Sequence, residues 1–309
     1  MAVLNPPRAL PGLGRTIINL LLESQRSWDE DALLDVFKPS GLNEDITAQH
    51  GVKNTILALR SIGLLTIEDG LTPSEAVLKH SSGHVLSRTS FRRLLQIQVL
   101  DTDRDGDPWQ IRDGEGNTSG ARDITRALSW FLAQDALGGS LTWTASSAPV
   151  QTLQLTQFPS NDNETWALTN DTRWGAFSRW APALGLVSPS LVQKKPGLIP
   201  LPTTAIDDVL DELPAGRIPI NQFLTQLALA LPVLHGSVAR TSLAALLGTD
   251  PDPGVAASCA DSSVGQALRI LADRGRVTFE TLADAEGVRL SRYDEARITH
   301  VTLKRGAKR

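Results

Sequence analysis

Cysteine is almost absent from this chain. Cys259 is the single cysteine among 309 residues, and there is also only one methionine and one tyrosine. One cysteine excludes an internal disulfide and any zinc site built from several thiolates. No basic residue flanks Cys259 to activate its thiol, so we expect a small side chain that is at least half-buried. Such sparse cysteine is typical of a protein that works in a reducing cytosol.

Long apolar runs are also missing. The longest, around "FLTQLALALPVL", contains Gln226 and Pro232 and is shorter than the ~20 apolar residues that a membrane-spanning helix needs. The first residues, "MAVLNPPRALPGLGR", lack the basic segment and the apolar core of a signal peptide. We therefore expect a cytoplasmic protein with no membrane partner.

Neither sign of charge dominates. The formal net charge is -4, so the whole molecule is not a basic nucleic-acid binder, and any DNA-binding surface must be local. Hydrophobic residues make up 41% and charged residues 21%, which is enough apolar material for several cores. The length suits two or three domains.

Sequence motifs of enzymes are missing as well. The chain has no G-x-x-x-x-G-K-[ST] phosphate loop, no G-x-G-x-x-G after a strand and no G-x-S-x-G nucleophile turn. Its five histidines are scattered and form no evident ligand set. We therefore predict a protein that is not an enzyme and that holds no metal and no cofactor.

One acidic stretch resembles the start of a calcium-binding loop. "DTDRDGD" places Asp101, Asp103 and Asp105 at the offsets of such a loop. The twelfth position should hold a bidentate Glu, but the residue there is Arg112. We interpret the stretch as a solvated acidic turn.

The most informative feature that is present is a helix that ends at a glycine. In "ILALRSIGLLTIEDGLTPS" apolar residues at helical spacing lead to Gly63, and extended residues with a tight turn follow. Glycine allows the chain to turn back because it adopts the left-handed conformation without strain. The pattern recurs at Gly185 and Gly275, each with helical segments upstream. A winged helix-turn-helix has its elements in this order, with helices followed by a hairpin.

The fold prediction follows from this repeat. We predict a mainly α chain with short antiparallel β-wings, built from tandem winged helix-turn-helix modules. The boundaries come from composition: residues 1–100 as a first module with a trailing helix, 101–120 as an acidic, Gly-rich loop or linker, 121–213 as a middle helical or winged-helix-like module, and 214–309 as a C-terminal module with a basic tail.

Basic residues are the candidate DNA contacts. The C-terminal module carries them on its last helix and at the end of that helix, and on its last strand and tail: Arg269, Arg274, Arg276, Arg297, Lys304, Arg305, Lys308 and Arg309. A helix in the major groove, with a hairpin and tail that neutralise phosphates, would bind double-stranded DNA. Acidic residues in the same third of the chain nearly cancel this charge. In the first module, Lys53, Asn54 and Arg60 lie on the predicted third helix beside few other cations.

A family resemblance points the same way. The start, "NPPRALPGLGRTIINLLLESQ", with a winged helix and further helical modules after it, resembles DpdG-like proteins. These are accessory proteins in bacterial gene clusters that insert or police 7-deazaguanine modifications in DNA. The resemblance rests on the first 70 residues and the overall length, and it identifies no site residue. It implies a defence role against foreign DNA, exerted in a complex with nuclease or helicase partners.

Our leading hypothesis is a non-enzymatic adaptor that binds double-stranded DNA and recruits protein partners in a bacterial anti-phage defence or DNA-processing complex. One alternative is a protein-only scaffold, a winged-helix homodimer that bridges an SMC-like or other ATPase assembly. Another is a transcription regulator. The regulator predicts sequence-specific binding to paired half-sites, whereas the scaffold predicts negligible DNA binding and a stable dimer.

Overall fold

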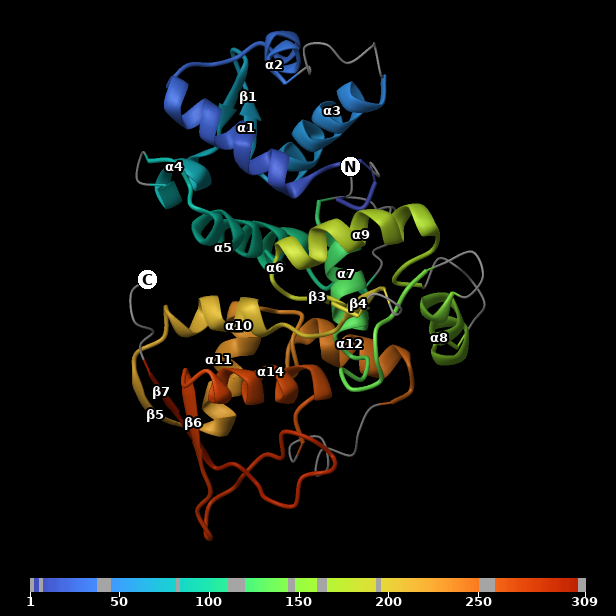
Figure 1. Cartoon of the computed structure of the whole chain (residues 1–309), viewed down its shortest axis with the longest axis vertical. Coiled ribbons are helices and arrows are strands. Elements are labelled where there is room, and N and C mark those ends of the chain that lie inside the picture. The colour runs from blue at the N-terminus through green and yellow to red at the C-terminus, as the bar shows by residue number, and fades with distance from the viewer. Residues whose placement is uncertain are drawn as a thin grey trace. The chain divides into compact units, whose positions relative to one another are not determined.

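The computed structural model forms two compact units (Figure 1), built from Met1–Gly106, Ile111–Ile124 and Asn170–Leu184, and from Asp107–Gln110, Thr125–Thr169 and Gly185–Arg309. The structure describes residues 3–5, 8–37, 46–81, 84–110, 120–143, 148–159, 166–192, 196–249 and 259–304, and of residues 46–49 it describes the backbone alone.

The first unit begins with helices and a short hairpin. Its elements are α1 (Pro11–Ser24), α2 (Glu30–Val36), α3 (Ile46–Ser61), β1 (Leu65–Ile67), β2 (Leu71–Pro73), α4 (Glu75–Ser81), α5 (Arg88–Val99), α6 (Thr102–Asp105) and, from later in the chain, α9 (Asp171–Ala183). Strands β1 and β2 are antiparallel, and Trp28, between α1 and α2, forms a further antiparallel bridge to Leu71.

Local chemistry explains where these helices begin and end. The Asp29 carboxylate accepts hydrogen bonds from the backbone N–H groups of Asp31 and Ala32, which caps α2. At the end of α3, Gly63 has φ 75°, and the Leu64 N–H donates to the Leu59 carbonyl at 2.8 Å. Because a left-handed residue lets the chain reverse and satisfy the last carbonyls, the helix passes directly into the hairpin.

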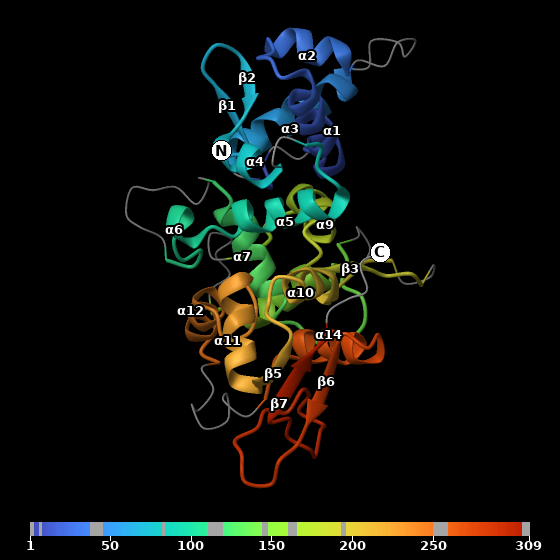
Figure 2. The same cartoon turned by 90° about the vertical axis from the view of Figure 1, so that its left-hand side faces the viewer.

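The second unit holds the larger sheet. Its elements are the greater part of α7 (Arg122–Phe131), α8 (Pro149–Gln157), β3 (Ser188–Pro189), β4 (Leu198–Ile199), α10 (Thr203–Leu210), β5 (Gly216–Pro219), α11 (Ile220–Ala230), α12 (Val238–Leu246), α14 (Ser262–Asp273), β6 (Val277–Glu280) and β7 (His300–Leu303). Strands β5, β7 and β6 form an antiparallel sheet in that order, and α14 packs on β6 (Figure 2).

One order of elements occurs three times along the chain. In each repeat a strand or single bridging residue pairs with the second strand of a hairpin that follows a Gly-ended helix. The pairs are Trp28 with Leu71, Leu141 with Leu198, and β5 with β7. The three predicted glycines have nearly equal φ values: Gly63 75°, Gly185 71° and Gly275 70°.

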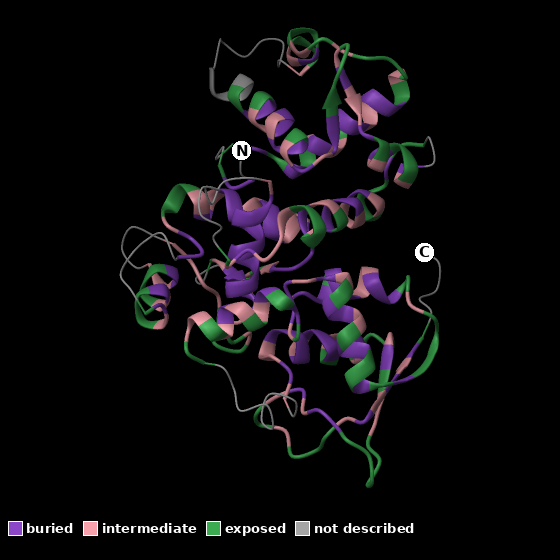
Figure 3. Ribbon diagram, turned by 180° about the vertical axis from the view of Figure 1, so that it is seen from behind, coloured by how far each residue is buried: buried purple, intermediate pink, exposed green. Residues whose placement is uncertain are grey.

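The core of each unit comes from the apolar faces of its helices (Figure 3). In the first unit, Ile17, Ile56 and Leu59 have no exposed surface; in the second, Phe223 and Leu268 have none. Burial of such side chains contributes roughly 1.5–3 kcal/mol each, so these faces fix the helices in place.

The prediction of a mainly α chain with short antiparallel strands is confirmed. The division at residues 100, 120 and 213 stays a prediction. The two compact units divide the chain differently from the predicted modules, because each unit contains segments that are distant in sequence. Within the described residues, no helix is long and apolar enough to cross a membrane.

Candidate nucleic-acid interface

Two of the predicted basic residues lie together at one end of the three-stranded sheet. Arg274 is exposed at the C-terminal end of α14, and Lys304 is exposed just after β7. The Lys304 backbone N–H donates to the Arg276 carbonyl at 2.9 Å, which aligns the two chain segments. Arg305, Lys308 and Arg309 lie outside the described residues.

Arg276 belongs to the same end but directs its guanidinium to carboxylates. It donates to Asp207 at 2.5 Å and also to Asp211, and only 13% of its side chain is exposed. Burial acts to lower the pKa of Arg276, but the hydrogen bonds to these two carboxylates raise it above its ordinary value. The charge of Arg276 is therefore largely balanced within the second unit.

Arg269 and Arg297 are not part of that cluster. Arg269, on α14, forms an ion pair with Asp294 of the long β6–β7 hairpin. Arg297 is exposed before β7, whereas Lys304 follows that strand, so the two lie at opposite ends of it. The predicted set is thus divided among three places.

Helix α14 makes several contacts within its own unit. The Ser262 hydroxyl donates to the Asp135 carboxylate at 2.6 Å, and the Ser263 hydroxyl donates to the Leu132 carbonyl at 2.6 Å. The hairpin backbone lies so close to Gly265 that a Cβ there would overlap the Leu290 carbonyl oxygen. Together with the Arg269–Asp294 pair, these contacts engage much of the helix.

The outward side of α3 is different. His50, Lys53 and Arg60 are exposed, and Asn54 and Leu57 are half-buried. Their spacing of three and four residues places them on one face. No side chain of His50, Lys53, Asn54 or Arg60 forms a hydrogen bond or ion pair within the described part of the chain. Residues 46–61 contain no Asp and no Glu.

A segment near the N-terminus lies along α3. The Leu10 N–H donates to the Thr55 hydroxyl at 2.9 Å, and that hydroxyl donates to the Gly51 carbonyl at 2.7 Å. Arg8, two residues before Leu10, is exposed, and its carbonyl oxygen lies near Gly51. This arrangement places a fourth basic residue beside the first half of α3.

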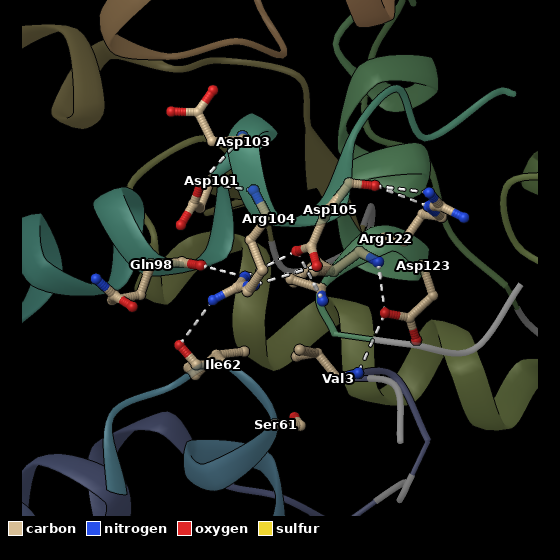
Figure 4. A network of polar contacts seen from close by, with 12 residues as sticks. Val3, Ser61, Ile62, Gln98, Asp101, Asp103, Arg104, Asp105, Arg122 and Asp123 are labelled. Carbon is tan, nitrogen blue, oxygen red and sulfur yellow. Dashed lines mark hydrogen bonds and ion pairs between the residues drawn. The ribbon is translucent and has the colours of Figure 1, made fainter. Parts of the chain in front are cut away.

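The C-terminal end of α3 is held by Arg104, as Figure 4 shows. Its guanidinium donates to the Ile62 carbonyl at 3.0 Å, to the Gln98 carbonyl at 2.6 Å and to the Asp105 carboxylate at 2.7 Å. Arg104 therefore ties the end of α3 to α5 and α6.

The network continues to the start of α7 and to the N-terminal segment (Figure 4). The Asp105 carbonyl accepts two hydrogen bonds from the Arg122 guanidinium, at 3.0 and 2.8 Å. The buried Asp123 carboxylate accepts the N–H groups of Val3 at 3.1 Å and Leu4 at 2.7 Å. Burial raises the pKa of Asp123 to about 6, against the lowering effect of these hydrogen bonds. No local sequence pattern indicates this network, because Val3 and Ile62 lie far from Asp123 and Arg104 in the chain.

The carboxylates of the acidic stretch are used as caps and ion-pair partners. Asp101 caps α6 by accepting the N–H groups of Asp103 and Arg104, and Asp105 pairs with Arg104. Among the described residues, no three His, Cys, Asp or Glu side chains are placed to hold a metal ion. Arg112, the twelfth position of the loop-like motif, lies outside those residues.

Comparison with known proteins gives one match. No curated protein and no solved structure matches the chain. A family model described as DpdG-like matches residues 1–285, which confirms the resemblance noted in the sequence. Because the match extends over most of the 309 residues, this chain belongs to the DpdG-like family.

Proposed function

We propose that this protein is a non-enzymatic adaptor that binds double-stranded DNA through winged-helix modules and recruits protein partners in a bacterial anti-phage defence or DNA-processing complex. Membership of the DpdG-like family supports the defence context. The proposed place of action is the cytoplasm, where foreign DNA would be met, and the proposed activity requires neither a metal nor a cofactor.

One observation carries the DNA-binding part of the proposal. The strand order β5-β7-β6, with α10 before β5 and α14 directly before the β6–β7 hairpin, is the arrangement expected of a winged helix-turn-helix. The first module repeats the pairing in reduced form, through Trp28 and Leu71. In helix-turn-helix proteins the recognition helix enters the major groove. Here that helix would be the one that ends at the glycine, followed by the hairpin.

The exposed cations of the C-terminal module support phosphate contact. Arg274 and Lys304 lie at the same end of the sheet, and Arg305, Lys308 and Arg309 follow in sequence. Such contacts are not specific for sequence, and they supply most of the non-specific affinity for DNA.

A protein-only scaffold, working as a homodimer, is the second candidate function. The contacts of α14 with its own unit favour it, since Ser262, Gly265 and Arg269 are all engaged. A module whose third helix is covered in this way would serve structure or protein binding rather than groove recognition.

Fluorescence anisotropy with a labelled duplex, measured over a salt series, separates the two candidates. We expect binding at low salt that weakens steeply as salt rises, because each phosphate contact releases counterions. Failure of the full-length chain to bind at low salt, together with a dimeric mass in light scattering, would replace the adaptor by the scaffold. Because the proposed adaptor has no phosphate-releasing or DNA-cutting activity, the test measures binding alone.

A further inference from the structure

We infer that the outward face of α3, rather than that of α14, is the surface that reads the DNA duplex. The face consists of His50, Lys53, Asn54, Leu57 and Arg60. The inference rests on the proposed DNA-binding function and assigns it to a particular surface of the first unit.

The chemistry of the α3 face suits a nucleic acid. Its cationic and amide side chains have no partner within the described part of the chain, so their donors are available to a ligand. The opposite side of the helix is apolar and buried, with Ile56 and Leu59 unexposed. A helix with one buried side and one open, carboxylate-free side can be inserted into the negative potential of the major groove.

Helix α14 contrasts with α3 in the state of its polar side chains. On that helix Arg269 already pairs with Asp294, and the hairpin backbone lies against Gly265. The remaining exposed positions near its end include Asp273 as well as Arg274. A groove-reading face needs free donors and few carboxylates, and α3 meets both conditions where α14 does not.

Helix α3 is held near its middle and at its end. In its second half, the Thr55 hydroxyl accepts the Leu10 N–H at 2.9 Å. At its end, Arg104 donates to the Ile62 carbonyl at 3.0 Å (Figure 4). Because a reading helix must present its side chains in a fixed register, such support lowers the ordering cost of binding.

The residue types suggest a division of roles. Asn54 and Lys53, in the middle of the helix, suit base edges, since Asn can bond adenine and Lys can bond guanine. Arg60 lies seven residues beyond Lys53, about 10 Å along the axis, and Arg8 lies beside the first half of the helix. These two arginines suit phosphates on either side of the groove.

The hairpin tip limits the strength of the contact. Glu68 and Asp69 are exposed there, so the tip would be repelled by phosphate. We therefore expect few phosphate contacts from this module, so that it contributes little to the salt slope of the whole chain and more of its own affinity comes from base contacts.

The test compares α3 variants with a matched control in the full-length chain. Lys53→Ala combined with Arg60→Ala removes two exposed cations, and Lys79→Ala removes one exposed cation from α4 of the same unit. With a fluorescein-labelled, mixed-sequence duplex, the double variant should weaken binding and flatten the log–log salt slope by roughly 0.9, the value for the one phosphate contact of Arg60. Lys79→Ala should leave affinity and slope unchanged.

Asn54→Ala tests base reading separately. The probe is the duplex that wild type enriches from a randomised pool. The variant should bind this duplex roughly 5- to 150-fold more weakly and should show a relaxed base preference at one position. The inference is overturned if the α3 variants bind like Lys79→Ala while Arg269→Ala loses affinity. In that outcome the proposed function stands and α14 is the reader. If wild type does not bind at all, the proposed function fails as well.

Discussion

The carboxylate of Asp123 accepts a 2.7 Å hydrogen bond from the backbone N–H of Leu4, which lies 119 positions earlier in the chain. Val3 and Ile124 donate to the other carboxylate oxygen, at 3.1 and 2.8 Å. Leu4 and Val3 have no exposed surface. A single buried acid therefore holds the N-terminal segment that precedes α1 and approaches the proposed reading helix.

This acid should give the first unit a distinctive response to pH. Burial raises the pKa of Asp123 from 3.8 to about 6 in the folded chain. The folded state then binds the proton more tightly, so stability is full below pH ~4 and falls as pH rises towards ~6. The loss is on the order of 3 kcal/mol. Urea unfolding of wild type between pH 4 and pH 7 measures it.

The matched variant is Asp123→Asn. It cannot ionise, so the pH dependence in this window should vanish. Its amide also replaces one acceptor by a donor that faces backbone N–H groups, which should cost roughly 1–3 kcal/mol at pH 4. An unchanged slope of stability against pH in Asp123→Asn would mean that another group titrates.

The second unit should respond in the opposite sense. Burial acts to raise the pKa of Asp261, but Arg240 and His235 outweigh it and lower the value from 3.8 to about 2. The Arg240 guanidinium donates to this carboxylate at 2.9 Å. The stabilisation is present above pH ~4 and is lost as pH falls through ~2.

Arg240→Ala tests that pair at neutral pH. It leaves a mostly buried carboxylate without its main partner and removes a hydrogen bond to the Ser129 carbonyl, so we expect a loss of roughly 2–3 kcal/mol. Arg217→Ala is the control, because both side chains of its pair with Glu280 are more than one third accessible to solvent and such pairs contribute little. Equal losses in the two variants would contradict the assignment.

The close approach of the hairpin to α14 gives a packing prediction. A Cβ at Gly265 would overlap the Leu290 carbonyl, and backbone cannot move aside as a flexible side chain can. Gly265→Ala should therefore destabilise the chain by about 1–3 kcal/mol or more, measured by thermal unfolding. Gly12→Ala, where no atom lies within 4 Å of the added Cβ, should be neutral or slightly stabilising.

These relationships show which features were accessible from the sequence. The helix ends at Gly63, Gly185 and Gly275 were predictable, because helical spacing and the need for a left-handed residue are both local. The residue that adds to each two-stranded sheet was not predictable, since Trp28 and Leu141 are single bridging residues without a strand pattern.

The candidate site was accessible only in part for the same reason. Exposed cations can be read from the sequence, but their partners cannot. Arg276 meets Asp207 and Asp211, 69 and 65 positions earlier, and no local pattern indicates this pairing. The exposed face of α3 was visible as helical spacing, whereas the absence of carboxylate partners among the described residues emerged only from the folded chain.

The last prediction concerns the basic tail. Removing residues 305–309 takes away Arg305, Lys308 and Arg309 but keeps Lys304, whose N–H bonds the Arg276 carbonyl at 2.9 Å and completes the end of the sheet. The truncated chain should therefore fold like wild type, with the same unfolding midpoint.

If all three cations of the tail contact phosphate, the log–log salt slope should flatten by roughly 2.7 units, at about 0.9 per contact. Affinity should fall alike for every duplex sequence, because phosphate contacts carry no base information. If removal of the tail changed the preference for duplex sequence, the tail would have to contact bases. If the salt slope stayed unchanged, the phosphate contacts would be left to α3, Arg8 and Arg274.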